Sequence, residues 1–436
     1  MSELSKKSHM SAYKQEPESS EKSARRSEQP QRPEGTPTPH RPPPPHESRG
    51  PDGAIGERER LRVISFGTAI AGTVSSSVLA ELGADVVKVE GRDRPDNVRR
   101  LGLAGESPGR EPSGASTSTM FAAFNRSVRG IVLNMKRDGA VEVLERLAGV
   151  ADVVIENFGP GVMDRWGVGY ERLAAVNPRL VMLSISGYGR TGPRSGYYAY
   201  GSNISSFTGL THLWGAAHGT HYDHVAQIHG VAAVLAALAQ RDRTGLGSHI
   251  DLAQTETAAA VMGPLLLEYL VNGDDPAPAG NAVPGAALSG VFPCRGEDAW
   301  VAVELTGEAD AATLGAFLGV SAGDRLEQAL RAWTARHTPH QAMMLLQRAG
   351  IAAGVVQNGE DVARDPQHRA RGFVVETGHP DLPPAEQPGP PLRLSVTPAR
   401  VRRPAPRLGE HTTEVLREWL DLPEAEISDL RERGVV

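Results

Sequence analysis

The feature that most constrains the fold is an alternation of short apolar runs with helical segments from about residue 60 onward. The apolar runs, rich in Val, Ile and Leu, are residues 62–66, 85–90, 131–135, 152–156 and 180–186. Apolar residues at helical spacing fill residues 74–82, 139–147 and 170–176 between them. Strands joined through helices pair in parallel and are buried on both faces. The pattern therefore predicts an α/β protein with a parallel sheet that helices cover on both sides.

The rest of the chain continues this alternation less regularly. Further strands and helices are expected at residues 248–252, 254–270, 290–293, 300–305, 310–350, 412–420 and 424–433, with weaker strand signals at residues 355–356 and 373–376. An extended, proline-rich segment is expected at residues 377–407. A stretch rich in Gly, Pro, Asn and Asp between residues 272 and 286 is typical of a linker. We divide the chain into a tail (1–57), a large α/β domain (58–271), a linker (272–286), a small α/β domain (287–390) and a C-terminal segment (391–436).

The first 57 residues differ in composition from all that follows. Apolar residues are sparse, Ser, Glu, Lys, Arg and Pro dominate, and prolines run without a break from Pro42 to Pro45. Such a segment buries too little apolar surface to offset the entropy lost on ordering, so we expect a disordered tail. It lacks the apolar core of a signal peptide. A solvated tail without function and a docking or regulatory tail both remain open.

Composition excludes several classes of protein. No run of about 18 apolar residues is present, so we expect no membrane-spanning helix. The net charge of −6 argues against general nucleic-acid binding. Cys294 is the only cysteine, which excludes a disulfide within the chain and is compatible with a cytoplasmic location. The histidines at positions 218, 221, 224 and 229 have no acidic neighbour except Asp223, so we expect no metal site.

The first strand, turn and helix are compatible with a dinucleotide site at first sight. The turn reads GTAIAG at residues 67–72, not G-x-G-x-x-G. The middle glycine, which lets the backbone approach a pyrophosphate, is therefore missing. The sequence disfavours a nicotinamide cofactor.

A single carboxylate, Asp223, stands at the start of a long apolar helix at residues 225–238. An Asp in this position can cap the helix, a contact that contributes about 1 kcal/mol. A carboxylate can also act as a nucleophile that splits one difficult group transfer into two easier steps. The residues by themselves leave both interpretations open.

Six segments form a common pattern in a fixed order. They are AG at 71–72 with LGADVVKVE at 82–90, FNRSVR at 124–129 with LNMK at 133–136, ADVVIENFGPG at 151–161 with DRWG at 164–167, Asp223 with LAAL at 235–238 and RTGLG at 243–247, DPQHRARGF at 365–373, and LGEHTTEVL at 408–416 with GVV at 434–436. Together they resemble the family III CoA-transferases of the CaiB/BaiF type, which include formyl-CoA transferase and alpha-methylacyl-CoA racemase.

The resemblance implies more about fold and assembly than the pattern of strands and helices does. It implies that the large domain (58–271) is Rossmann-like and binds CoA, and that the C-terminal segment packs back on it. It also implies that two chains form an interlocked homodimer; a heteromer with a paralogue is the alternative. The implied substrates are an acyl-CoA and a free carboxylic acid, with no permanently bound cofactor.

For Asp223 the resemblance implies the role of nucleophile. The carboxylate attacks the acyl-CoA thioester and passes through a mixed anhydride and an aspartyl-CoA thioester. The helix start is expected to keep this carboxylate ionised.

Other residues match CoA-side positions of the family. They are Ile70, Ala71, Arg92, Arg129, Leu133, Lys136, Asn157, Phe158, Arg165, Trp166 and Tyr200. An arginine beside a flat aromatic, as at Arg165 and Trp166, suits a phosphate and an adenine ring.

Three departures from the family pattern bear on function. Ile70 stands where members often carry Gln or Leu, so a side-chain amide is missing there. Glu90 is followed by Gly91, which places the expected phosphate-binding arginine, Arg92, one residue late. Tyr200 stands where the racemase branch has a histidine, and tyrosine, with an ordinary pKa near 10, is a poor proton shuttle at neutral pH.

The sequence therefore predicts an acyl-CoA:carboxylate CoA-transferase. Two alternatives stay open: an acyl-CoA racemase or isomerase, and a non-catalytic CoA-binding partner subunit. The acid that is transferred is not readable, although tyrosines at residues 197–200 are compatible with an aromatic or medium-sized acyl group.

Overall fold

The computed structural model describes residues 60–100, 118–214 and 219–436, apart from gaps at 276, 279, 322, 324 and 380–381. The tail predicted at residues 1–57 lies outside this part of the chain. Within it, no helix is long and apolar enough to cross a bilayer.

The large domain is built on a six-stranded sheet in which every neighbouring pair is parallel. Its strands are β1 (Arg62–Phe66), β2 (Asp85–Glu90), β3 (Arg129–Val132), β4 (Val153–Glu156), β5 (Val181–Ser186) and β6 (Ser248–Ala253), in the spatial order β3-β2-β1-β4-β5-β6. Nearly all residues of β1 to β5 are buried, as expected for strands covered on both faces. The predicted α/β class and parallel sheet are confirmed.

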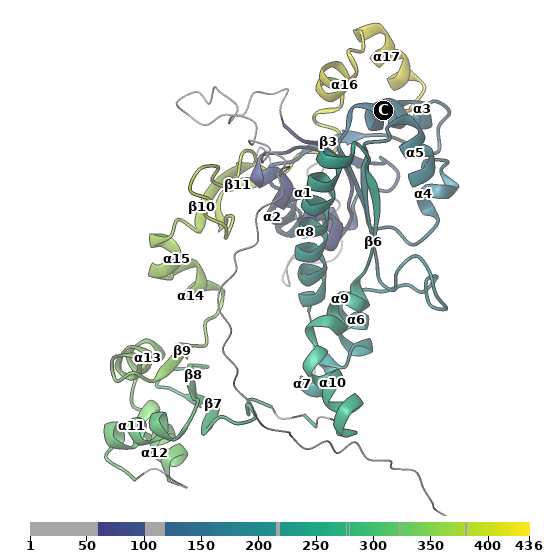
Figure 1. The fold of residues 1–436 in the computed structure, drawn as a ribbon. Helices are drawn as coiled ribbons and strands as arrows, with labels where there is room; N and C mark the ends of the chain where they lie inside the picture. The colour runs from purple at the N-terminus through teal and green to yellow at the C-terminus, as the bar shows by residue number, and fades with distance from the viewer. Residues whose placement is uncertain are drawn as a thin grey trace, which may run out of the picture. The chain divides into compact units, whose positions relative to one another are not determined.

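Helices cover both faces of this sheet (Figure 1). Between β1 and β6 the chain forms α1 (Ala71–Leu82), a 3₁₀ turn (Asn97–Arg100), α2 (Thr119–Phe124), α3 (Ala140–Val150), α4 (Val162–Arg165), α5 (Tyr170–Val176), α6 (Gly201–Phe207), α7 (Leu210–Trp214) and α8 (His221–Thr244). The α1 and α8 helices pack against one another and bury apolar residues such as Leu79 and Val234 against one face. On the other face, α3 and α5 close a second core around Leu144 and Leu173.

The segment after β6 departs from the prediction. Instead of one helix over residues 254–270, the chain forms α9 (Gln254–Val261) and α10 (Gly263–Asn272). Pro264 lies in the first turn of α10. Because proline has no amide hydrogen, it interrupts the helical ladder and starts a new helix instead.

A second group of strands has its own core. Strands β7 (Leu288–Pro293), β8 (Trp300–Leu305) and β9 (Ala352–Val355) form an antiparallel sheet in that order. Helices α11 (Glu308–Leu318), α12 (Leu326–Thr334) and α13 (Pro339–Arg348) supply Leu314, Leu330 and Leu346 to the core around Val301.

The proline-rich stretch also differs from the prediction. After α14 (Gly359–Arg364) and α15 (Pro366–Ala370), strands β10 (Val374–His379) and β11 (Leu382–Pro388) form an antiparallel pair. A sheet of only two strands has two edges, where a residue such as Pro384 need not donate a hydrogen bond. An extended stretch follows to about residue 407.

The end of the chain contributes to the core of the large sheet. Helices α16 (Thr412–Leu420) and α17 (Glu424–Glu432) bury Leu416, Trp419 and Ile427 in the same core as α3. The backbone amide of Val132 in β3 donates to Thr412 Oγ1 at 3.1 Å. Residues distant in sequence thus complete the edge of the sheet at β3.

Candidate functional site

A cavity of about 430 Å³ opens where the chain leaves strands β1 to β4. The strand order reverses between β1 and β4, because β2 and β3 lie on one side of β1 while β4 and β5 lie on the other. Open α/β sheets bind ligands at the carboxyl ends of their strands, at such a reversal. The topology therefore marks this cavity as a ligand site before any side chain is considered.

Five residues that the sequence singled out line this cavity: Leu133, Lys136, Phe158, Arg165 and Trp166. The Phe158 and Trp166 rings meet edge to face with their centroids 5.2 Å apart. Aromatic faces beside cations suit a ligand with a flat ring and phosphates.

The cations at the cavity are available to a ligand. Lys136, Arg165 and Arg94 line it, and none of them has an ion pair within the described residues. The sequence pointed to Arg92 instead, but Arg92 is exposed and does not line the cavity. The segment after β2 curves so that Arg94, two residues later, reaches it; a backbone path of this kind has no signal in the sequence.

Arg129 lies apart from the cavity and is engaged elsewhere. Its side chain is 3% exposed and pairs with Asp85, with Glu414 at 3.0 Å and with Glu418 at 2.5 Å. A guanidinium surrounded by three carboxylates has few donors left for a phosphate. Arg129 joins β3 to the C-terminal helix α16, which the sequence could not indicate because Glu414 and Glu418 are almost 300 residues away.

Ile70 and Ala71 lie in the turn between β1 and α1, which is tightly constrained. Both side chains are buried. The Asn157 amide receives a hydrogen bond from the Thr68 amide at 2.8 Å and donates one to the Thr68 carbonyl at 2.9 Å. A Cβ on Gly72 would come within 2.8 Å of Asn157 Oδ1, so glycine is required there. Asn157 thus holds the turn from the end of β4.

Buried charges support the same turn from the other side. Lys88 Nζ donates to the Gly67 carbonyl at 2.5 Å and pairs with Asp96 at 2.8 Å. Asp96 Oδ1 in turn accepts from the Ala69 amide at 3.0 Å. Residues of alternating charge near Glu90 are unremarkable in the sequence, so this support was missed.

Asp223 lies in the first turn of α8, and its carboxylate does not cap the helix. The residue before α8 is Thr220, and the Asp223 carboxylate instead accepts a hydrogen bond from Gln254 Nε2 at 2.7 Å. Burial raises the pKa of Asp223, while the bond from Gln254 and the charge of His224 lower it. The net direction is upward, so the helix start does not depress this pKa as the sequence led us to expect.

The second oxygen of Asp223 faces the start of α6. Gly201 is buried, and a Cβ there would lie 2.8 Å from the Gly219 carbonyl oxygen and 2.9 Å from Asp223 Oδ2, so the start of α6 packs directly against this oxygen. Tyr200, the residue before Gly201, is 66% exposed. The side chains of Tyr197, Tyr198 and Tyr200, which directly precede Gly201 in the chain, are all more than half exposed.

Asp223 and the cavity share one edge of the sheet. Gln254 follows directly on β6, whose carboxyl end is on the same edge as those of β1 to β4 because all six strands are parallel. At about 5 Å per strand, β6 lies roughly 10 Å from β4. A ligand bound in the cavity needs an extended arm along this edge to reach Asp223.

A family profile with the description CoA-transferase family III matches residues 59–412. The chain belongs to this family. Membership makes it an acyl-CoA:carboxylate CoA-transferase, with a CoA thioester and a carboxylic acid as substrates. The resemblance seen in the sequence is confirmed.

Relatives match along most of the chain. A succinate–glutarate CoA-transferase from Agrobacterium fabrum is 30% identical over 383 residues, which are 82% of this chain and 94% of the relative. A probable CoA-transferase from Mycobacterium tuberculosis is 29% identical over 407 residues, 85% of this chain, but this match spans only 50% of that protein's length. The crystal structure of a CaiB/BaiF family protein from Brucella suis, 28% identical, superposes with a TM-score of 0.72 and covers 83% of this chain and 99% of that one.

Proposed function

We propose that this family III CoA-transferase works through Asp223 as its nucleophile. The observation that carries the proposal is the asymmetry of the carboxylate: Gln254 donates a hydrogen bond to Oδ1, while no described side chain donates one to Oδ2. A half-buried carboxylate with one free oxygen is suited to attack.

The transfer proceeds in balanced steps. Asp223 Oδ2 attacks the thioester carbonyl, the carbon–sulfur bond breaks, and CoA thiolate leaves behind a mixed anhydride. The thiolate then attacks Cγ of Asp223, which releases the first acid as a carboxylate and leaves an aspartyl-CoA thioester. The second acid reverses these steps and departs as the new CoA thioester.

The cavity between β1 and β4 is the proposed seat of the CoA nucleotide. Trp166 and Phe158 provide the surface for the adenine ring, and Arg165, Lys136 and Arg94 pair with the phosphates. The pantetheine arm then runs along the carboxyl edge of the sheet toward Gln254 and Asp223.

Two classes of acid are candidates for transfer. The Agrobacterium relative is named for succinate and glutarate, which makes dicarboxylic acids the first class to test. The exposed tyrosines before α6 make aromatic acids the second. Succinyl-CoA is the donor we choose for the assay.

We also propose that two copies of the chain form an interlocked dimer. No side chain of α10 is buried, and Leu266, Leu267 and Leu270 are more than half exposed. Contiguous apolar surface of this kind marks an interaction site.

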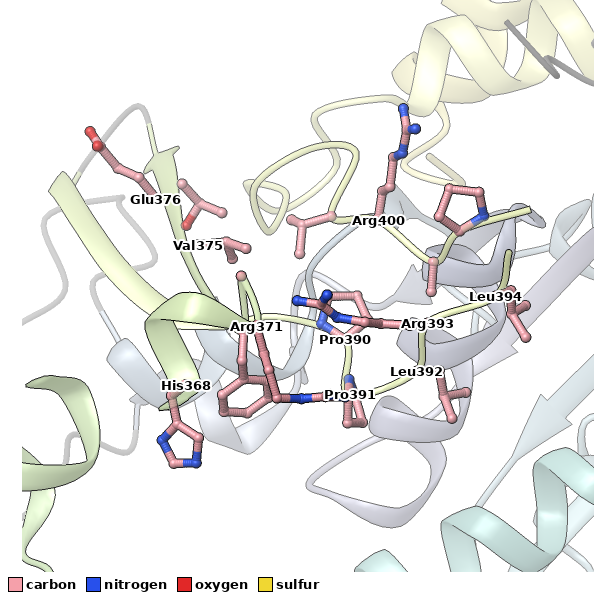
Figure 2. A pocket seen from close by; sticks show the side chains of 16 residues that line it. His368, Arg371, Val375, Glu376, Pro390, Pro391, Leu392, Arg393, Leu394 and Arg400 are labelled. Atoms are coloured by element: carbon pink, nitrogen blue, oxygen red, sulfur yellow. The ribbon is translucent and has the colours of Figure 1, made fainter. Parts of the chain in front are cut away.

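A second surface supports the same assembly. A cavity of about 850 Å³ lies between β10 and the extended stretch after β11, with Leu392, Arg393 and Arg371 on its walls (Figure 2). Leu392 and Leu394 are about half exposed there. An extended segment that buries so little of its own apolar surface is suited to lie against a second copy.

The experiment is a transfer assay with the full chain. Succinyl-CoA is incubated with glutarate, malate, citramalate or benzoate, and new CoA thioesters are separated by chromatography. We expect transfer with at least one acid and its loss in Asp223→Asn. Transfer that persists in Asp223→Asn contradicts the proposal. Deuterium appearing at Cα of a 2-methylacyl-CoA in heavy water, with no transfer to any acid, identifies an isomerase instead.

A further inference from the structure

Gln254 is the one side chain that donates a hydrogen bond to the Asp223 carboxylate within the described residues. It is the first residue of α9 and follows directly on β6, so sheet and helix fix its backbone. Its side chain is 7% exposed and therefore has little freedom to turn away. The amide nitrogen lies 2.7 Å from Oδ1.

The two oxygens of Asp223 are distinguished by this contact. Oδ2 faces Gly201, where even a single added carbon would lie 2.9 Å away. Oδ1 accepts the hydrogen bond from Gln254 and Oδ2 accepts none from a described side chain, so Oδ2 is the oxygen assigned to the attack. The hydrogen bond from Gln254 therefore fixes the orientation of the Asp223 carboxylate.

This orientation matters most after the first step. In the mixed anhydride, Oδ2 has become the bridging oxygen and Oδ1 is the carbonyl oxygen of the aspartyl group. When CoA thiolate attacks Cγ, the electron pair of that carbonyl moves onto Oδ1 and a tetrahedral oxyanion forms. A donor already aimed at Oδ1 stabilises this charge as it develops, without reorganisation.

We propose that Gln254 is the oxyanion donor for every step in which the Asp223 carbonyl is attacked. The inference rests on the proposed nucleophile. In the turn before α1, the side chain of Ile70 has no amide and cannot donate a hydrogen bond; the residue is 8% exposed. Gln254 supplies an amide from a different element, across the sheet edge at β6.

The proposal predicts a split between the two chemical steps. The attack of Oδ2 on the thioester builds charge on the substrate carbonyl, not on Oδ1. Loss of the Gln254 amide should therefore leave the first release of CoA nearly unchanged and slow the return of CoA to Cγ. Oxyanion donors typically contribute about 100-fold to 1000-fold in kcat.

The experiment compares Gln254→Met, which keeps the volume but removes the donor, with Gln254→Leu and the wild type. Gln240→Leu, an exposed position on α8, is the control. Rapid quenching after mixing with succinyl-CoA measures the burst of free CoA, and steady-state assays give kcat and KM. We expect a normal burst, KM within about threefold, and a kcat at least about 100-fold lower in both variants.

A pH profile provides a second readout. Because the bond from Gln254 lowers the pKa of Asp223, its removal should move the acidic limb of kcat/KM to higher pH. A kcat within about threefold of wild type, or a burst slowed as much as kcat, would overturn the oxyanion role. Failure of the nucleophile itself looks different, since Asp223→Asn would then retain the burst and the transfer. If Gln254→Met does not fold, Gln254→Leu decides the question, because it also removes the donor and adds no charge beside Asp223.

Discussion

At the scale of single residues, the account depends on how Asp223 is surrounded. The family pattern was sufficient to single it out, because the motifs on either side keep their order along the chain. Gln254 had no such signal: it lies 31 positions away, and a glutamine after a strand is common in any sequence. Contacts that depend on where two elements meet cannot be read from either element alone.

The raised pKa of Asp223 predicts an effect on stability. Between 3.8 and the raised value, the folded chain keeps a proton that the unfolded chain has released, so stability falls as pH rises through this window and stays lower above it. Asp223→Asn should therefore raise Tm at pH 7, and the gain should shrink as the pH approaches 3.8. Calorimetry from pH 4 to pH 8 measures this difference. Asp275→Asn, at an exposed position, is the control; an equal gain for it, or a lower Tm for Asp223→Asn, contradicts the prediction.

Gly201 gives the second prediction at this scale. In Gly201→Ala the new methyl group would lie 2.8 Å from the Gly219 carbonyl oxygen and 2.9 Å from Asp223 Oδ2, so the start of α6 and the Asp223 carboxylate must move apart. We expect kcat/KM to fall by about 100-fold or more, a loss that a misplacement of about 1 Å can cause. Circular dichroism should show an unchanged fold. Gly263→Ala, where nothing lies within 4 Å of the added carbon, should retain full activity.

At the scale of elements, the turn between β1 and α1 shows what the sequence predicts well and what it does not. The predicted strand, turn and helix are present, whereas Asn157 was expected only as a CoA-side residue. The role of Asn157 as a clamp and the support from Lys88 and Asp96 required the structure. The cationic residues of the cavity were harder to predict from the sequence. Arg94 lines the cavity in place of Arg92, and Arg129 pairs with carboxylates elsewhere.

The cavity between β1 and β4 provides the prediction at this scale. Arg165→Ala removes a cation with no ion pair of its own, so the fold should be unaffected while KM for the CoA thioester rises. A hydrogen bond to a charged group contributes about 1.5–3 kcal/mol, which is about 10-fold or more in KM. Steady-state kinetics at two salt concentrations measures the change. Arg364→Ala, which breaks only an exposed pair with Glu360, should leave KM unchanged; equal effects of the two variants would contradict this site for CoA.

At the scale of the whole molecule, the alternation of strands and helices predicted the parallel sheet but not its order. The order β3-β2-β1-β4-β5-β6 follows from crossovers on both faces, which local spacing does not encode. Pro264 indicates the break between α9 and α10, although the apolar spacing over residues 254–270 favours one continuous helix. The sequence has a weak strand signal at residues 373–376, which overlap β10, but none for its partner β11, since a stretch rich in proline is typical of an extended chain.

Self-association is the prediction that belongs to the whole molecule. Leu267 and Leu270 on α10 are at least 60% exposed, so charging them costs an isolated chain little and an interface a great deal. The double variant Leu267→Glu, Leu270→Glu should shift the protein from dimer to monomer in light scattering coupled to size exclusion. Val176→Glu, at an exposed apolar position on α5, should remain dimeric. A wild type that is monomeric at micromolar concentration contradicts the interlocked dimer.

The most direct test of the central claim is to trap the intermediate on Asp223. The full chain is mixed with succinyl-CoA, quenched with hydroxylamine, digested and mapped by mass spectrometry. Both the anhydride and the aspartyl thioester react with hydroxylamine at Cγ, so we expect a hydroxamate on Asp223 that requires the CoA thioester and is absent from Asp223→Asn. Transfer that proceeds with no modification at Asp223, or with modification at another carboxylate, would contradict the account.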